Sequence, residues 1–278
     1  MNFREFANFQ TQNAEMNRVL TMADSICQSH APVLISGAPG IGKTTLALQI
    51  GFRNKSYPYQ VMFQKNMDPR GLKDGTCLIV ENLESLEKED QETLVSLLDI
   101  IRMGLKVRII ATADNYVKNY VEQGQLKRDL YFRLSVIHLK VPSLNERPED
   151  ILLLSDLLVK STALILGHSK NYQLLESAKS KLKAYSWPFN VTELQTVLER
   201  AVTISQSGLI EDKHIQFEHI ERKQMEFVGL TLAEMEKKLI LQTLEMTKQN
   251  RTKAASVLGI SIRTLRNKLS EYREAGVL

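Results

Sequence analysis

Residues 37–44 read Gly-Ala-Pro-Gly-Ile-Gly-Lys-Thr and match the whole of the phosphate-binding pattern G-x-x-x-x-G-K-[ST]. The preceding residues 31–36 (APVLIS) have the composition of a buried strand, and residues 45–52 (TLALQIGF) predict the first turns of an apolar helix. Glycines let the backbone N–H groups of such a loop turn toward phosphate oxygens, and the helix N-terminus adds positive partial charge. This order of elements predicts nucleotide binding rather than a glycine-rich turn that matches by chance.

The side chains of the loop indicate what it binds. Lys43 is expected to reach the terminal phosphates, and the hydroxyl of Thr44 suits Mg²⁺. ATP and Mg²⁺ are therefore the predicted cofactors. The predicted nucleotide-binding residues are Gly37, Ala38, Pro39, Gly40, Ile41, Gly42, Lys43, Thr44 and Thr45.

Strand and helix patterns alternate after this loop, which is typical of a parallel sheet with helices on its faces. From residue 149 the pattern becomes wholly helical, and a polar stretch at 207–228 separates these helices from a last helical segment. The sequence thus predicts an α/β part, an all-α part and a C-terminal helical module. The further expected strands are residues 76–80, 107–112 and 136–141, and the expected helices are residues 91–101, 151–166, 174–185 and 191–205.

The composition excludes several classes of protein. Of the 278 residues, 43% are hydrophobic and 24% are charged, which is ordinary for a soluble globular protein. No run approaches the roughly 18 apolar residues of a membrane span, and the N-terminus lacks the apolar stretch of a secretory signal. Cys27 and Cys77 are isolated and the five histidines are scattered, so neither a disulfide framework nor a zinc site is expected. These features predict a cytoplasmic protein.

Positive charge is concentrated toward the C-terminus. The formal net charge is +4, but residues 248–278 hold seven Lys or Arg and two Glu, a net +5. The other residues therefore sum to −1. A nearly neutral body with a basic end suggests a polyanionic partner, and double-stranded DNA is the first candidate.

Residues 250–269 predict two helices joined by a tight turn. Gly259 supplies the turn, Ser261 is expected to cap the second helix, and a preceding helix begins at Thr231, where Glu234 completes a capping box. Basic and amide side chains remain on the exposed side, where they suit a major groove and its phosphates. An ordinary basic helical hairpin is the alternative. The predicted DNA-binding residues are Arg251, Lys253, Ser261, Arg263, Thr264, Arg266, Asn267 and Lys268.

Four further segments identify a family. Residues 108–114 (RIIATAD) are similar to a strand that carries a sensor I residue, and residues 124–134 (GQLKRDLYFRL) to a segment that carries arginine fingers. Residues 141–151 (VPSLNERPEDI) resemble the entry to a helical lid, and residues 185–194 (YSWPFNVTEL) a sensor II segment. With the phosphate loop, these segments make the chain resemble the NtrC-type bacterial enhancer-binding regulators over nearly its whole length. In that family an AAA+ ATPase domain precedes a Fis-type helix-turn-helix.

The resemblance implies a domain organisation and partners. It places an AAA+ α/β nucleotide-binding subdomain at residues 1–142, a helical lid at 143–206, a linker at 207–228 and the helix-turn-helix at 229–278. The expected partners are double-stranded DNA, RNA polymerase and further copies of the chain, in an AAA+ ring or in a dimer through the C-terminal domain. Because no receiver domain is visible in the sequence, phosphorylation of an attached module is not the expected input.

The chain departs from the family in one loop. Family members that activate sigma-54 polymerase carry a Gly-Ala-Phe-Thr-Gly-Ala loop between the phosphate loop and the Walker B strand. Nothing between Lys43 and Glu81 resembles this loop, and the interval is too short for its hairpin. Direct remodelling of sigma-54 is therefore not expected.

The Walker B carboxylates are also altered. The family has an Asp in the Mg²⁺ shell, followed by a Glu that polarises the attacking water. Alignment on the strand puts Val80 and Glu81 in these two places, whereas alignment on the following helix, which matches over a longer stretch, puts Glu81 and Asn82 there. Either register lacks one carboxylate. Since an amide takes no proton from water, slow hydrolysis is expected if Asn82 replaces the Glu.

Other nucleotide-sensing positions differ as well. By resemblance, the first arginine finger is Lys127 and the second is Arg133, while Thr192 and Asp114 replace the sensor II arginine and the sensor I asparagine. Lysine keeps the charge of arginine but loses its planar, bidentate fork. Binding is thus expected to be kept and hydrolysis weakened. The predicted catalytic residues are Glu81, Asn82, Lys127 and Arg133, and the predicted Mg²⁺ site is formed by Thr44 and Glu81.

Three functions fit this pattern. The first is a sequence-specific DNA-binding transcriptional regulator in which ATP acts as a ligand. The second is an active AAA+ ATPase that remodels a protein partner, with the helix-turn-helix as a DNA tether. The third is an architectural protein that bends DNA and binds it broadly. Steady multiple turnover of ATP is expected only of the second.

Overall fold

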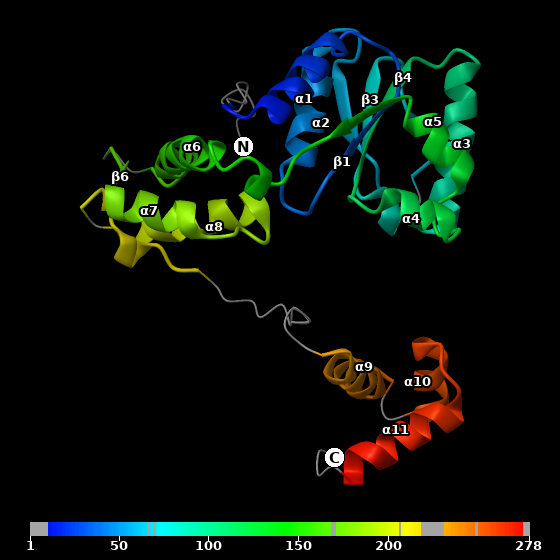
Figure 1. Ribbon diagram of the computed structural model, residues 1–278. Coiled ribbons are helices and arrows are strands. Elements are labelled where there is room, and N and C mark those ends of the chain that lie inside the picture. Colours follow the sequence, from blue (N-terminus) through cyan, green and yellow to red (C-terminus); the bar gives the residue numbers. More distant parts are fainter. Residues whose placement is uncertain are drawn as a thin grey trace. The chain divides into compact units, whose positions relative to one another are not determined.

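The computed structural model describes residues 11–65, 67–68, 71–167, 171–205, 207–217, 231–247 and 250–274. The chain divides into two compact units, Met1–Phe217 and Glu218–Leu278 (Figure 1). Each unit has its own apolar core. Within the described ranges, no helix is both long and apolar enough to cross a membrane.

The first unit is built on a five-stranded sheet in which all strands are parallel, in the order β2-β3-β4-β1-β5. In a parallel sheet, the loops that follow the carboxyl ends of neighbouring strands meet at one edge, where ligands bind. The strands are β1 (Val33–Ser36), β2 (Tyr59–Met62), β3 (Thr76–Val80), β4 (Val107–Ala113) and β5 (Ile137–Lys140).

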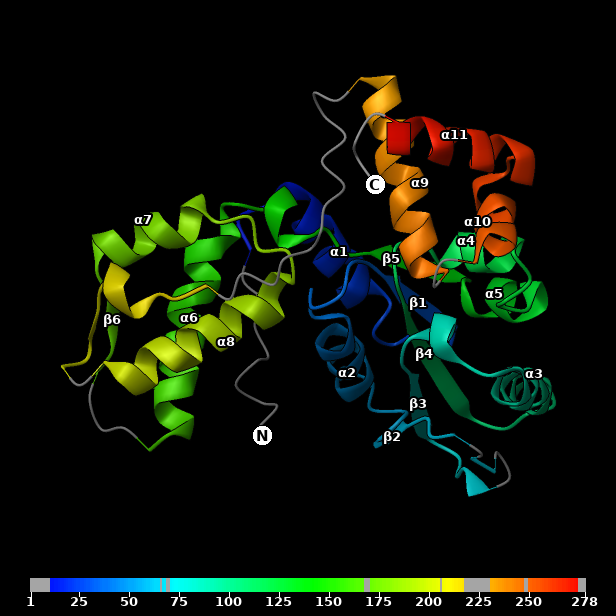
Figure 2. The same ribbon diagram turned by 90° about the horizontal axis from the view of Figure 1, so that it is seen from below.

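Helices cover both faces of this sheet (Figures 1 and 2). Because strand side chains alternate between faces, Cys77 and Ile79 of β3 pack with one set of helices, and Leu78 and Val80 pack with the other. The predicted α/β class with a parallel sheet is thereby confirmed. The first set is α1 (Ala14–Ser25) and α2 (Lys43–Arg53), and the second is α3 (Lys88–Arg102), α4 (Val117–Glu122) and α5 (Arg128–Leu134).

Several elements of this unit were not predicted, and helix α1 and strand β2 are two of them. Helix α1 begins after Asn13, whose side chain accepts hydrogen bonds from the amides of Glu15 and Met16 at 3.0 Å each. Strand β2 lies at the sheet edge and is at most half buried, so its sequence lacks the apolar run of a central strand. Both elements are amphipathic or short, which weakens their sequence signal.

A helical lid completes the first unit. It consists of α6 (Asp150–Ile165), α7 (Glu176–Ala184), α8 (Asn190–Ile204) and the short parallel pair β6 (Gln173–Leu174) and β7 (Leu209–Ile210). Trp187 is fully buried in its core and donates from Nε1 to the Leu182 carbonyl at 3.0 Å. Residues 207–217, assigned to a linker from the sequence, pack on this lid because Ile210 and Ile215 are fully buried there. The remainder of the expected linker, 218–228, lies outside the described residues.

The second unit contains α9 (Leu232–Met246), α10 (Arg251–Leu258) and α11 (Ile262–Glu274). The predicted capping box is present: Glu234 accepts from the Thr231 amide at 2.8 Å, and Thr231 Oγ1 accepts from the Glu234 amide at 3.3 Å. The face of α9 that packs on the other two helices carries Ile240 and Leu244, whereas Leu239 is 41% exposed. The partner residues in this core are Ala254, Ala255, Leu265 and Tyr272.

Candidate nucleotide-binding and DNA-binding sites

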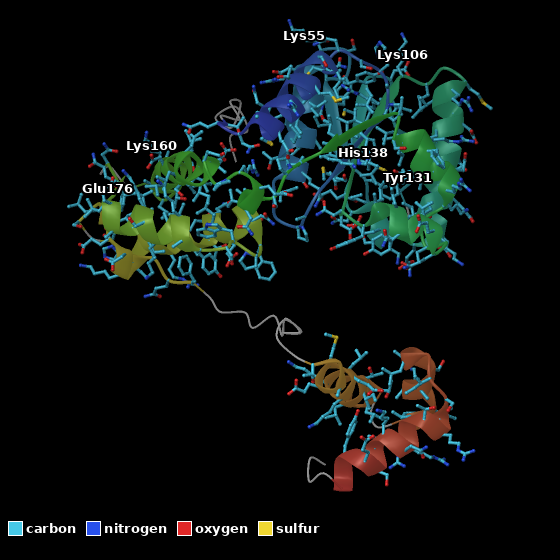
Figure 3. The ribbon with its side chains drawn as sticks, viewed as in Figure 1. Lys55, Lys106, Tyr131, His138, Lys160 and Glu176 are labelled. Atoms are coloured by element: carbon cyan, nitrogen blue, oxygen red, sulfur yellow. The ribbon has the colours of Figure 1, made fainter. Side chains whose placement is uncertain are left out.

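The phosphate loop starts from a well-anchored strand end. The Gly37 amide donates to the Ala113 carbonyl of β4 at 3.2 Å. On the other side, Ser36 Oγ and His138 Nε2 of β5 lie 2.7 Å apart, and Figure 3 shows His138 on its strand. Burial is the main cause that lowers the pKa of His138. These contacts on both sides fix where the loop leaves the sheet.

Two glycines of the loop are required by its backbone. Gly40 and Gly42 have φ of 76° and 96°, in the left-handed region that other residues rarely adopt. A Cβ at Gly40 would lie only 2.2 Å from the Phe189 carbonyl oxygen of the lid. Helix α2 begins directly after Gly42, so its N-terminal amides point into the loop.

Lys43 lies inside the loop. Its side chain is buried, and Nζ donates to the carbonyls of Gly37 at 2.7 Å and Ala38 at 3.0 Å. Burial lowers the pKa of Lys43, while the negative charges of Glu84 and Asp114 act in the opposite direction. The loop therefore holds a cation at its centre, with two carboxylates close enough to influence it.

The lid donates hydrogen bonds to three successive carbonyls of the loop. Asn190 Nδ2 reaches the Pro39 oxygen at 2.9 Å, the Thr192 amide reaches Gly40 at 3.1 Å, and Arg147 Nη2 reaches Ile41 at 3.3 Å. Asn190 also accepts from the Leu144 amide at 2.8 Å. Thr192, the sensor II position, thus contacts the loop backbone. Asn190 and Arg147 were not singled out from the sequence, because their partners lie more than 100 residues away along the chain.

The residues after β3 lie in different environments, which bear on the two expected Walker B registers. Val80 is fully buried in the sheet, whereas the Glu81 carboxylate accepts a hydrogen bond from the Thr44 hydroxyl. The next residue, Asn82, is exposed and has φ of 51°. Its backbone N–H donates to Thr112 Oγ1 at 3.1 Å. This arrangement favours the register in which Glu81 takes the place of the Asp and Asn82 that of the Glu.

A carboxylate that was missed from the sequence lies beside these residues. Glu84, in the short 3₁₀ turn η2 (Leu83–Ser85), accepts from the Asp114 amide at 3.2 Å. Burial raises the pKa of Glu84, and the charge of Asp114 raises it further, against the lowering effects of backbone N–H groups and Lys43. The Asp114 carboxylate accepts from the Tyr116 amide at 2.7 Å and the Tyr120 hydroxyl at 3.1 Å.

Both expected finger residues form ion pairs with helix α3. Lys127 Nζ lies 2.8 Å from Glu92 Oε1, and Arg133 Nη1 lies 2.5 Å from Asp99 Oδ1. Arg133 also contacts Asp129, one turn earlier on α5, at 2.9 Å. The loop and these two side chains are thus not brought together within one chain.

The second unit presents the predicted DNA-binding side chains at its surface. Ser261 caps α11 by accepting from the Thr264 amide at 3.0 Å, and Gly259 adopts φ of 66° in the turn before it. Lys268 differs from the other predicted contacts, because its Nζ lies 2.8 Å from Glu236 of α9. The exposed ones are Arg251, Lys253, Ser261, Arg263, Thr264, Arg266 and Asn267.

Comparison with known families covers these same regions. Residues 11–144 match the sigma-54 interaction domain, residues 145–228 the AAA+ ATPase lid domain, and residues 231–272 the bacterial regulatory protein Fis family. The transcriptional regulatory protein FlbD of Caulobacter vibrioides is 31% identical over 94% of this chain and 70% of its own length. The regulatory protein AtoC of Escherichia coli is 28% identical over 96% of this chain and 68% of its own length.

Solved structures share the fold. NtrX from Brucella abortus, crystallised in complex with ATP, has a TM-score of 0.64 at 20% identity and covers 95% of this chain and 69% of its own. The RuvB Holliday junction branch migration motor of Thermotoga maritima has a TM-score of 0.54 at 18% identity, over 93% of this chain and 85% of its own. The chain belongs to the family of bacterial transcriptional regulators that combine a sigma-54 interaction domain of AAA+ type with a Fis-type, DNA-binding helix-turn-helix.

Proposed function

We propose that this protein is a cytoplasmic, sequence-specific DNA-binding regulator. It binds ATP, hydrolyses it slowly and acts without directly remodelling sigma-54. The observation that carries the proposal is the contrast at the nucleotide site. The phosphate loop is complete, with Lys43 at its centre, while the Walker B register that we infer puts the amide side chain of Asn82 where the family has a carboxylate.

The loop suits the phosphates of ATP. A buried ammonium group and the amides of a helix N-terminus converge on it, and both favour anions. On phosphate binding, Lys43 would exchange its bonds to the Gly37 and Ala38 carbonyls for bonds to phosphate oxygens.

The residues present also fit Mg²⁺. The Thr44 hydroxyl and the Glu81 carboxylate are in direct contact, and they are the oxygen donors that this cation prefers. When bound, the metal would neutralise charge on the terminal phosphates. Thr44 and Glu81 would hold it, directly or through its water shell.

The proposal that this protein does not directly remodel sigma-54 rests on the length and sequence of one connection in the first unit. Residues 63–75 are the whole connection from β2 to β3, and their sequence holds no Gly-Ala-Phe-Thr-Gly-Ala pattern. Regulation by this protein is therefore expected to persist in a strain that lacks sigma-54. Complete loss of regulation there, together with binding to purified sigma-54, would contradict this part of the proposal.

DNA binding is proposed to use α11 for bases and the start of α10 for phosphates. Arg263 and Asn267 are exposed within the first two turns after the Ser261 cap, where a recognition helix meets base edges. Arg251 and Lys253 are exposed at the N-terminus of α10. A dimer through the second unit would use the outer face of α9, where Leu239 is exposed.

The two roles in DNA binding are separable by mutation. Arg263→Ala is expected to cost about 1–3 kcal/mol on the preferred site and to relax sequence choice. Lys253→Ala is expected to weaken binding to all duplexes alike and to reduce the salt slope by about one unit. Selection from a random duplex pool, followed by binding at several salt concentrations, measures both effects. Equal loss of sequence choice in the two variants would contradict the division of roles.

The second candidate is an active ATPase that remodels a protein partner while the helix-turn-helix tethers it to DNA. A further carboxylate, Glu84, lies close to the phosphate loop and favours some hydrolysis. Steady-state turnover on DNA distinguishes the two: the regulator proposed above releases phosphate far more slowly than the roughly 1–10³ s⁻¹ of typical enzymes. Brisk turnover that is lost in Lys43→Ala would favour the remodelling ATPase.

A further inference from the structure

We propose that Glu84 is the general base for the slow hydrolysis of ATP, in place of the carboxylate that Asn82 lacks. The inference rests on the proposed function, because it requires ATP in the phosphate loop. At this site, a side chain that follows β3 accepts a hydrogen bond from the backbone that follows β4. Both segments lie at the carboxyl ends of the strands, as does the phosphate loop after β1.

The local fold directs Glu84 toward the loop. Asn82 adopts the left-handed conformation, with φ of 51°, and the chain then turns into η2. Leu83 is fully buried and anchors this turn in the sheet core. Glu84 follows it, half buried, with its Oε2 atom 3.2 Å from the Asp114 amide. The side chain is therefore held by a fixed backbone group rather than left in solvent.

The charged groups around Glu84 include the lysine of the phosphate loop. Its negative charge acts on Lys43, the residue expected to contact the β- and γ-phosphates. Asp114 faces it from the end of β4, and Tyr120 faces it from α4. Burial and the Asp114 charge together raise the pKa of Glu84, which makes its carboxylate a stronger base.

The neighbouring carboxylates are engaged elsewhere. Glu81 accepts a hydrogen bond from Thr44 and belongs to the proposed Mg²⁺ site. Both oxygens of Asp114 accept hydrogen bonds, one from the Tyr116 amide and the other from the Tyr120 hydroxyl. Glu84 is held by backbone amides. Among these three carboxylates, Glu84 is therefore the one placed to accept a proton from water.

The step balances without any further reactant. A water molecule forms a bond from its oxygen to the γ-phosphorus, and its proton passes to the Glu84 carboxylate. The bond between the γ-phosphorus and the β–γ bridging oxygen breaks, and ADP and inorganic phosphate leave. The protonated Glu84 then returns its proton to solvent.

Single-turnover hydrolysis with the full chain in excess over radiolabelled ATP and Mg²⁺ tests the role of Glu84. Glu84→Gln is expected to lower the rate about 100-fold or more, because it keeps size and hydrogen bonding but accepts no proton. The matched control is Glu89→Gln, an exposed carboxylate in the first turn of α3, which is expected to stay within about twofold of the parent. The parent rate is expected to rise with pH through a pKa above the usual value of 4.5 for Glu, and this rise is expected to vanish in Glu84→Gln.

Calorimetry gives a second measure that does not depend on hydrolysis. Removing a negative charge beside the γ-phosphate is expected to raise the affinity for a non-hydrolysable ATP analogue, relative to ADP, about fivefold in Glu84→Gln. Absence of ATP binding to the parent would overturn the proposed function itself. ATP binding without measurable hydrolysis, or equal single-turnover rates in parent and Glu84→Gln, would overturn the role of Glu84 alone.

Discussion

The phosphate loop and the ends of strands β3 and β4 face the same proposed nucleotide, yet they depart from the family pattern to different degrees. The loop keeps each expected residue, and three lid donors fix its carbonyls. At the strand ends, Asn82 and Asp114 stand where carboxylate and amide side chains, respectively, are expected from the family resemblance, and Glu84 supplies a carboxylate at a position that no motif marks. In the proposed function, nucleotide binding and hydrolysis thus depend on separate segments, which can change independently of one another.

Removing the loop cation has the largest expected effect. Lys43→Ala deletes the charge that is expected to contact the terminal phosphates, at a cost of about 1.5–3 kcal/mol, which is more than tenfold in ATP affinity. Calorimetry with ATP and Mg²⁺ measures this loss. The matched control is Lys55→Ala, an exposed lysine labelled in Figure 3, which is expected to leave the affinity unchanged. Equal affinities of the parent and Lys43→Ala would place the nucleotide elsewhere.

Removing the hydrogen bonds that Asn190 of the lid makes is expected to have the next largest effect, which is on stability. Asn190→Gly deletes bonds to the Leu144 amide and the Pro39 carbonyl and is expected to lower the free energy of unfolding by about 1–3 kcal/mol. Asn190→Ala is expected to lose about 1 kcal/mol more, because φ at this position is 55° and only glycine adopts it freely. Urea unfolding of the two variants separates these contributions. Equal stabilities of Asn190→Gly and the parent would show that the lid does not restrain the loop.

Restoring a carboxylate at the strand end is expected to have a smaller effect. Asn82→Glu should raise single-turnover hydrolysis about tenfold while ATP affinity stays close to that of the parent. The side chain is exposed beside the nucleotide site, so it is accessible to water, but the left-handed backbone favours asparagine over glutamate. An unchanged rate would mean that the missing carboxylate at this position does not limit hydrolysis.

The sensor II position is expected to have the smallest effect. The Thr192 hydroxyl lies 3.5 Å from the Gly40 carbonyl oxygen, whereas the Thr192 amide lies 3.1 Å from it. Alanine retains the amide, so Thr192→Ala should change ATP affinity by less than about twofold and stability by less than about 0.5 kcal/mol. A tenfold loss of affinity would instead show that this hydroxyl contacts the nucleotide.

Strong local patterns predicted much of the fold. The apolar run at β3 and the helical periodicity at α3 and α8 each gave an element within a few residues of its observed bounds. Helix α1 was missed because only Met16 and Ala23 are buried along it.

The residues of the candidate sites also fall into two groups: those that a local sequence pattern predicted and those that only the fold brings together. The loop residues were predicted because the pattern is contiguous and each residue has its own physical requirement. Glu84 could not be found, since its role depends on the turn at Asn82 and on an amide 30 residues later. The ion pair between Lys268 and Glu236 also escaped prediction, because charge alone does not reveal which face of a helix meets another helix.

The segment before β1 determines where this protein can be shortened. Asp150 of the lid is fully buried and accepts from the Thr11 hydroxyl at 2.6 Å and the Gln12 amide at 2.7 Å. Arg108 of the sheet is fully buried and donates to the carbonyls of Ile26 and Cys27 at 2.8 and 2.9 Å. A fragment that starts at β1 keeps both buried charges and loses these partners, a change that typically costs several kcal/mol. A stable fragment of the first unit is therefore expected to include residue 11, although the phosphate loop itself starts at residue 37.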